Sequence, residues 1–286
     1  MSGSGKAAAA APAKLSQLLP RVFKRKPVST SGQAYGVQIT LEASDAHTLE
    51  QMLKSLPSTW RAGEAGAGNA HFRLTTIDAV SYGLDRDGIA VASGPRDATL
   101  ETFDRLLRRH IAASAPEHVF VHAGTVAHQG RAIVMPGLSF SGKTTLVAAL
   151  VRAGASYYSD EYAVLDASGL LHPYPKPLSI RLEGDQGRQT DHDVSRLGGV
   201  AGVDPIPIGL VVSTHYHPGA EWRPTELSPS ETVLELVPHT FPIGDRLAAS
   251  LEVLGRAVGS VITLKGERGD ADETAALILE RFPGHP

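Results

Sequence analysis

Cysteine is absent from this chain of 286 residues. Its absence excludes disulfide bonds, thiol catalysis and the zinc sites that are built from cysteine. It also suits a reducing compartment, so we expect a cytoplasmic protein. A run of about 20 apolar residues, which a membrane-spanning helix requires, is missing too, and no transmembrane segment is expected. The hydrophobic share of 42% is nevertheless ample for a globular core.

Positive charge is scarce outside the N-terminal region. Residues 1–33 contain six basic residues and no acidic one, which leaves 21 basic against 30 acidic residues, a net charge of −9, for the rest. Because nucleic-acid binding needs clustered cations, we expect no nucleic-acid partner. Apolar residues at helical spacing in the basic segment are also typical of a membrane-surface helix, but Pro20 interrupts the pattern. We interpret residues 1–33 as a flexible basic tail.

Residues 34–113 have the patterns of a small α+β domain that ends in a linking helix. Alternation of apolar and polar residues predicts strands and a hairpin, and apolar residues at helical spacing predict helices. The expected elements are strands at 35–41 and 71–77, a helix at 47–56, a hairpin at 81–91 and an amphipathic helix at 95–113.

Residues 114–286 alternate short apolar strands with helices, which is typical of an α/β domain. Residues 183–205 contain five glycines and no periodicity, so we expect either a disordered stretch or a functional lid there. The expected strands are 119–121, 125–127, 132–135, 162–165, 170–174, 208–213 and 260–264, and the expected helices are 143–153, 228–237, 243–257 and 271–282.

Residues 137–144 read Gly-Leu-Ser-Phe-Ser-Gly-Lys-Thr, the complete phosphate-binding pattern Gly-x-x-x-x-Gly-Lys-Thr. Backbone N–H groups of such a turn point at an anion, and the following helix directs its positive end to the same place. Lys143 adds a charge for the terminal phosphates, and the Thr144 hydroxyl is a ligand for Mg²⁺. Phe140 is unusual where many such loops have glycine, so we expect a variant loop. The predicted nucleotide-contacting residues are Gly137, Ser139, Ser141, Gly142, Lys143, Thr144 and Thr145.

Phosphoryl transfer also needs metal ligands and a group that orients or deprotonates the nucleophile. Asp160 and Glu161 follow the pattern after one short helix. Adjacent side chains on extended chain diverge, so we expect one to face Mg²⁺ or the nucleophile and the other to order water or the partner ligand. The alternative is an acidic turn in solvent.

Three further residues are candidates for contacts with the substrate or the phosphates. Prolines around Lys176 and Arg181 fix an extended path that would hold both cations in place, and arginine binds phosphate or carboxylate with two hydrogen bonds. The alternative is a pair of solvated charges. His122 ends a predicted strand and would donate to a phosphate or pair with a carboxylate, although a lone histidine is more often structural.

Three segments together resemble the HPr serine kinase/phosphorylase family and its HPr-kinase-like relatives. They are 121–124 (Val-His-Ala-Gly), 137–144 and 159–161 (Ser-Asp-Glu), in the order and at the separations of the family, and the segment 174–179 is also similar to the relatives. The resemblance covers about residues 115–286. It implies a nucleotide-binding α/β fold related to phosphoenolpyruvate carboxykinase, with ATP and Mg²⁺ as cofactors and a serine hydroxyl as acceptor.

The resemblance also implies roles for individual residues. Asp160 would be the base that accepts the hydroxyl proton and would lie at the metal with Thr144 and Glu161. Lys143 would bind the phosphates, and His122 would support the active site. Members of the family are often hexamers, so a homo-oligomer is one expectation.

The chain departs from the family at several points. Phe140 stands where the family loop has glycine, Glu161 stands where it has a second aspartate, and the stretch that supports the reverse phosphorylase reaction is missing. The N-terminal domain of HPr kinases is not recognisable either, so HPr is not the expected substrate. Shorter relatives include kinases that modify serine on small ribosomally made peptides, such as lasso peptides.

We therefore expect a kinase whose partners are a nucleotide and a peptide or small-protein acceptor. Two alternatives remain open. One is a kinase for the hydroxyl of a small metabolite, and the other is a nucleotide-sensing module that binds without transfer, which a distorted loop at Phe140 would favour.

Overall fold

The computed structural model describes residues 26–64, 66, 70–137, 141–176, 178–181, 189–192, 194–241, 243–244 and 246–282. Their fold is mixed α/β and divides into two compact units. The described residues up to 56 and from 60 to 110 form the first unit, and residues 57–59 with those from 111 onward form the second. The division falls within one helix, α2 (Arg96–Ser114), just before the predicted boundary at residue 113.

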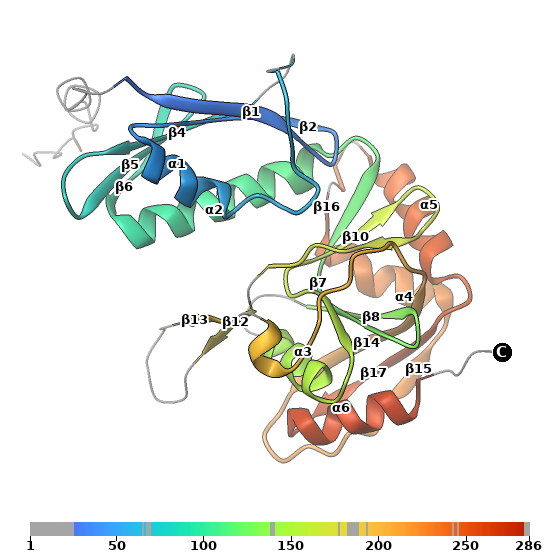
Figure 1. The fold of residues 1–286 in the computed structure, drawn as a ribbon. Coiled ribbons are helices and arrows are strands. Elements are labelled where there is room, and N and C mark those ends of the chain that lie inside the picture. The colour runs from blue at the N-terminus through green and yellow to red at the C-terminus, as the bar shows by residue number, and fades with distance from the viewer. Residues whose placement is uncertain are drawn as a thin grey trace, which may run out of the picture. The chain divides into compact units, whose positions relative to one another are not determined.

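The first unit is a six-stranded sheet with two helices (Figure 1). Its elements are β1 (Val28–Ala34), β2 (Val37–Ala43), α1 (Ala46–Leu53), β3 (Arg61–Ala62), β4 (Ala70–Thr76), β5 (Ser81–Arg86), β6 (Ile89–Pro95) and α2. The strand order is β3-β1-β2-β4-β5-β6. Apolar side chains alternate along β2, so that Ile39 and Leu41 are fully buried, and Phe103 of α2 packs edge-on against Phe72.

Strand β1 corrects the predicted tail, because it begins at Val28, inside residues 1–33. It forms a hairpin with β2 in which Ala34 pairs with Val37. The two residues between them, Tyr35 and Gly36, both have positive φ (49° and 76°), as a tight hairpin turn requires. The predicted strand at 35–41 therefore included this turn, and the observed strand begins at Val37. The turn was not expected because tyrosine is uncommon at positive φ. Residues 1–25 lie outside the described residues.

The second unit contains a nine-stranded sheet and a separate two-stranded hairpin. Its strands are β7 (His118–His128), β8 (Arg131–Pro136), β9 (Ser156–Ser159), β10 (Tyr162–Asp166), β11 (Leu171–His172), β12 (Leu178–Arg181), β13 (Gln189–His192), β14 (Ile208–Tyr216), β15 (Thr225–Leu227), β16 (Thr240–Phe241) and β17 (Ile262–Arg268). Its helices are α3 (Lys143–Arg152), η2 (Val194–Leu197), α4 (Pro229–Leu236), η3 (Val237–His239), α5 (Leu247–Val258) and α6 (Ala271–Glu280). The four α-helices confirm the helices predicted from periodicity in this part of the chain.

Helices cover both faces of the nine-stranded sheet (Figure 1). Its main path is β11-β10-β7-β8-β14-β17-β15, with β9 and β16 also paired to β7. One apolar cluster joins the sheet to α3 and α6, for example through Leu150 and Ile278. The other joins the opposite face to α4 and α5, for example through Leu236 and Leu254. Three layers of this kind bury the strands on both sides.

The structure of this unit differs from two of the predictions made from the sequence. Residues 119–121 and 125–127 were expected as separate strands, but β7 is one strand of 11 residues. The Gly124 between them is fully compatible with extended chain, and a Cβ there would lie 2.5 Å from Val147 of α3, so the glycine lets the helix approach. The predicted lid or disordered stretch at 183–205 contains β13 and η2, while residues 182–188 lie outside the described residues.

Three adjacent strands run parallel, and this places their ends together. β14 pairs in parallel with β8 on one side and with β17 on the other. Pro136, Tyr216 and Arg268, the last residues of the three strands, therefore lie at the same edge of the sheet, where ligands bind in open α/β sheets.

Among the described residues, no helix combines the length and the apolar character needed to cross a bilayer.

Candidate functional site

The glycine-rich segment connects β8 to α3, in the order strand, loop, helix that the pattern requires. Gly137, Ser141 and Gly142 are described, whereas residues 138–140, with the predicted contact Ser139 and the unusual Phe140, lie outside the described residues. The Ser141 hydroxyl is buried without a hydrogen-bond partner in the described part of the chain. Thr145 is exposed in the first turn of α3.

Gly142 forms the N-cap of α3 with a φ of 83°, a left-handed conformation that favours glycine. It has no side chain to cap the first N–H groups of the helix, so these groups stay available for an anion. The Arg268 guanidinium donates to the Gly142 carbonyl at 2.8 Å, and a Cβ on Gly142 would collide with it. Glycine is therefore required here on both steric and conformational grounds.

Arg268 was not recognised from the sequence. Its side chain is 2% exposed, donates also to the Gly269 carbonyl at 3.1 Å, and lies 5.4 Å from the ring centroid of Tyr216. It ends β17, two strands away from the loop strand. The parallel arrangement of these strands is the signal that would have found it, because their carboxyl ends share one edge.

Lys143 folds back over the loop. Its Nζ donates to the Gly137 carbonyl at 2.8 Å. Burial lowers the pKa of Lys143, and the charges of Asp160 and Glu161 oppose that shift. Two predicted acidic residues are thus within electrostatic reach of the predicted phosphate-binding lysine. The side chain crosses the space between the two ends of the loop.

Asp160 and Thr144 meet directly, although they are 16 residues apart. The Thr144 hydroxyl donates to Asp160 Oδ2 at 2.9 Å, and Asp160 Oδ1 is buried without a hydrogen-bond partner among the described residues. Burial raises the pKa of Asp160 to about 7, against the Thr144 hydrogen bond and the charge of Lys143, both of which lower it. The charge of Lys176 acts in the same direction as Lys143. A carboxylate with one free buried oxygen is costly unless a ligand is present.

A buried serine positions the acidic pair. Ser159 ends β9 and is 0% exposed, and its Oγ accepts hydrogen bonds from the N–H groups of Glu161 and Tyr162, both at 3.0 Å. The chain therefore turns sharply between β9 and β10. The Glu161 carbonyl accepts from the Ala123 N–H at 3.2 Å, which ties the turn to β7. This backbone arrangement holds Asp160 and Glu161 beside the loop.

The other predicted residues are placed as follows. The His122 carbonyl accepts from the Gly137 N–H at 3.3 Å, and its ring lies 6.1 Å from that of Tyr162. The Lys176 carbonyl accepts from the Tyr157 hydroxyl at 2.7 Å, which anchors this lysine near Asp160. Arg181 ends β12 opposite Gln189, and its side chain lies outside the described residues.

A second group of polar residues on the β14–β17 side was missed entirely. Glu235, near the end of α4, accepts from Ser213 Oγ at 2.6 Å and from Lys265 Nζ at 2.7 Å. Burial would raise the pKa of Glu235, but these hydrogen bonds outweigh it and the net shift is downward. His239 in η3 is within electrostatic reach of Lys143. No motif links these residues in the sequence, since they come from four separate elements.

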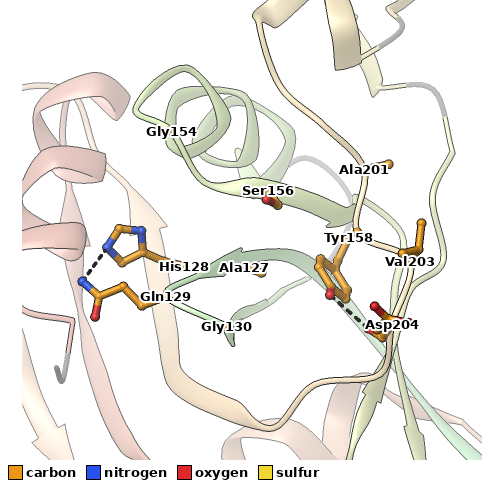
Figure 2. A pocket seen from close by; sticks show the side chains of 11 residues that line it. Ala127, His128, Gln129, Gly130, Gly154, Ser156, Tyr158, Ala201, Val203 and Asp204 are labelled. Atoms are coloured by element: carbon orange, nitrogen blue, oxygen red, sulfur yellow. Dashed lines mark hydrogen bonds between the residues drawn. The ribbon is translucent and has the colours of Figure 1, made fainter. Parts of the chain in front are cut away.

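A cavity of about 340 Å³ lies elsewhere in the second unit. Figure 2 shows that the turn between β7 and β8 lines one part of it. Tyr158 and Asp204 line another part, and the Tyr158 hydroxyl donates to the Asp204 carbonyl at 3.0 Å. This turn is at the start of β8, whereas the glycine-rich loop follows the end of that strand. None of the predicted site residues lines this cavity, so it is separate from the predicted site.

Comparisons with known proteins add little to this geometry. No family model matches the chain, and no curated protein matches it. Among solved structures, the chain is similar to the Hpr(Ser) kinase/phosphatase from Coxiella burnetii, with 14% sequence identity and a TM-score of 0.31 over 56% of this chain and 93% of that chain. A likeness of this strength carries no argument, so the function is inferred from the site itself.

Proposed function

We propose that the protein is a Mg²⁺- and ATP-dependent kinase that phosphorylates a hydroxyl group. The proposed acceptor is a serine of a peptide or small protein. One observation carries the proposal: Lys143, Thr144 and Asp160 converge where a glycine-rich loop leaves β8 and enters α3. Strand, loop and helix supply the anion-binding backbone, and the three side chains are those that phosphoryl transfer needs.

The polyphosphate of the nucleotide would lie against the backbone of the loop and the start of α3. Lys143 is already held over the loop by the Gly137 carbonyl, so its ammonium needs little reorganisation to bind a phosphate oxygen. Arg268 would act indirectly, because it holds the Gly142 carbonyl and with it the left-handed turn. Positioning and charge neutralisation are the main sources of catalysis in this class of reaction.

The residues present fit a magnesium ion. The Thr144 hydroxyl donates to Asp160 Oδ2, so a hydroxyl oxygen and a carboxylate oxygen lie together, and Mg²⁺ prefers oxygen ligands of this kind. No group of three or more His, Cys, Asp or Glu side chains that suits a metal occurs among the described residues, and Mg²⁺ bound with a nucleotide takes only one or two carboxylates beside water and phosphate. Thr144, Asp160 and Glu161 would hold it, and it would neutralise charge on the phosphates.

Asp160 is also suited to take the proton of the acceptor hydroxyl. A general base works best when its pKa lies near the working pH, and burial raises the pKa of Asp160 to about 7. Its Oδ2 is occupied by Thr144, which leaves Oδ1 for the incoming hydroxyl. Lys176, whose backbone is anchored by Tyr157, and Arg181 would bind the acceptor.

The test is transfer of a labelled phosphate. The purified protein is incubated with γ-labelled ATP and Mg²⁺, with and without peptides encoded beside its gene, and the label is followed by mass. Label on a peptide serine is the expected result. Label on a small metabolite would identify the alternative kinase, and tight nucleotide binding with no transfer to any acceptor would identify a nucleotide-sensing module instead.

A further inference from the structure

A second histidine, His239, lies close to the glycine-rich loop. β16 pairs with β7 so that Thr240 lies opposite Val121. His239, the last residue of η3, comes directly before Thr240 and therefore lies next to this strand pair. The His122 carbonyl, next to Val121 on β7, accepts the Gly137 N–H at the start of the loop, and His239 is within electrostatic reach of Lys143 at the end of the loop.

One ring nitrogen of His239 has no hydrogen-bond partner among the described residues. The side chain is half-buried, and Nδ1 is buried with no hydrogen-bond partner among the described residues. Buried polar atoms nearly always have partners, so such an atom beside an anion-binding loop points to a ligand. The Ser141 hydroxyl, in the same loop, is in the same state.

Charged groups face His239 from two elements. Lys143 approaches from α3, and Glu235 lies four residues earlier on the same face of α4 and η3. Glu235 is itself fixed by Ser213 of β14 and Lys265 of β17. Burial lowers the pKa of His239, Lys143 lowers it further, and Glu235 raises it, with a net downward shift. Burial and the charge of Lys143 therefore favour the neutral ring in the free protein.

We propose that His239 is a second phosphate-contacting residue, which takes up a proton when the polyphosphate of the nucleotide binds, and that Glu235 is its positioning residue. The inference rests on the proposed nucleotide site. A polyphosphate next to the ring favours the imidazolium, and the protonated ring then donates from both nitrogens. Glu235 would keep the ring oriented and offset the charge of Lys143.

The sign of the pH effect follows from linkage. The bound state has the higher pKa at His239, so affinity is greatest below the pKa of the free protein and falls as pH rises through the pKa of the complex. Replacing His239 by glutamine removes this dependence. The titration of the nucleotide itself is common to both proteins, so the difference between them isolates His239.

The experiment is calorimetric titration with ATP and Mg²⁺ at pH 6, 7 and 8.5, in two buffers of different ionisation enthalpy. The proteins are the full chain, His239→Gln, and the matched control His47→Gln, an exposed histidine of the first unit. His239→Gln is expected to weaken binding about tenfold at pH 6 and much less at pH 8.5, the size of one charge-assisted hydrogen bond. It should also lose the proton taken up at pH 7.

The outcomes separate the two proposals. Absence of ATP binding by the unchanged chain contradicts the proposed function. Normal binding with the same affinity, pH dependence and proton uptake in His239→Gln overturns the role of His239 alone. If His239→Gln does not fold, Glu235→Gln decides, since loss of the negative charge should reduce the proton uptake at pH 7 and unchanged uptake would contradict the inference.

Discussion

The two ends of β10 each carry an aspartate, and the two are treated in opposite ways. Asp166, at the end of the strand, accepts from Ser168, the Leu170 N–H and His172. Asp160, just before the strand, accepts only from Thr144 on one oxygen and has a buried second oxygen without a partner in the described chain. One carboxylate has its hydrogen bonds within a turn, and the other has one oxygen without a partner in the described chain.

The pKa values of these aspartates follow from this difference. Burial would raise the pKa of Asp166, but the hydrogen bonds from Ser168 and His172 bring it down to about 2. Burial raises the pKa of Asp160 to about 7, because fewer groups compensate it. Folding therefore favours the ionised form of Asp166 and disfavours that of Asp160. Such a cost is typical of a functional position and not of a structural one.

Asp160→Asn should have the largest effect on activity. Without the base, the transfer rate is expected to fall about 10³-fold, while ATP binding survives better than transfer. A steady-state assay of labelled phosphate transfer, combined with a binding titration, measures both. Full retention of the transfer rate would show that Asp160 is not the base.

The same substitution should stabilise the ligand-free protein. The folded pKa of Asp160 lies above the unfolded value of 3.8, so the unfolding free energy of the unchanged chain falls as pH rises from about 4 to 7. Asparagine removes that loss, and the gain should grow over this window to about 4 kcal/mol at pH 8. Denaturant unfolding at pH 4 and pH 8 checks it, and an equal difference at both pH values would be inconsistent with the raised pKa.

Lys143→Ala should come next in size. The lysine spans the loop through the Gly137 carbonyl and would bind the terminal phosphates, so ATP affinity is expected to fall about 100-fold. Transfer should be lost with it. Binding titration of ATP to the variant is the measurement, and the exposed Lys54→Ala, in the first unit, is the control.

Arg268→Ala tests how the loop is held. The substitution leaves the Gly142 and Gly269 carbonyls without their donor in a buried setting and opens a cavity beside Tyr216. We expect a loss of about 3 kcal/mol in unfolding free energy together with weaker ATP binding. Thermal and denaturant unfolding measure the first effect. An unaltered stability would mean that the buried guanidinium does not support the turn.

Asp166→Asn should have the smallest effect and sharpens the contrast with Asp160. It weakens several hydrogen bonds of the turn between β10 and β11, so the unfolding free energy is expected to fall by about 1 kcal/mol. The contribution of Asp166 is present above the unfolded pKa of 3.8 and is lost as pH falls through about 2. Transfer should be unchanged, and a large drop in transfer would remove the distinction between the two aspartates.

The sequence predicts local features of this molecule better than contacts between residues that are far apart in the chain. Apolar periodicity was sufficient for α3, α4, α5 and α6, and the spacing of Lys143 and Thr144 is contained within one short segment. The hairpin turn at Tyr35 was missed because its backbone conformation contradicts the preference of tyrosine.

Glu235, His239 and Arg268 could not be predicted from local patterns of this kind. Arg268 reaches the loop through the parallel order of β8, β14 and β17, and His239 comes near Lys143 where β16 pairs with β7. No short pattern encodes these strand pairings. Asp160 was predicted as a site residue, but its free oxygen and raised pKa depend on burial that only the folded chain produces.

The central claim is that the loop after β8, with Lys143, is a nucleotide-phosphate site. Calorimetric titration of the full chain with ATP and Mg²⁺, alongside Lys143→Ala and Asp166→Asn, tests it most directly. The expected result is saturable binding of one nucleotide per chain that Lys143→Ala loses and Asp166→Asn keeps. Absence of binding to the unchanged chain, or equal binding to all three proteins, would contradict the claim.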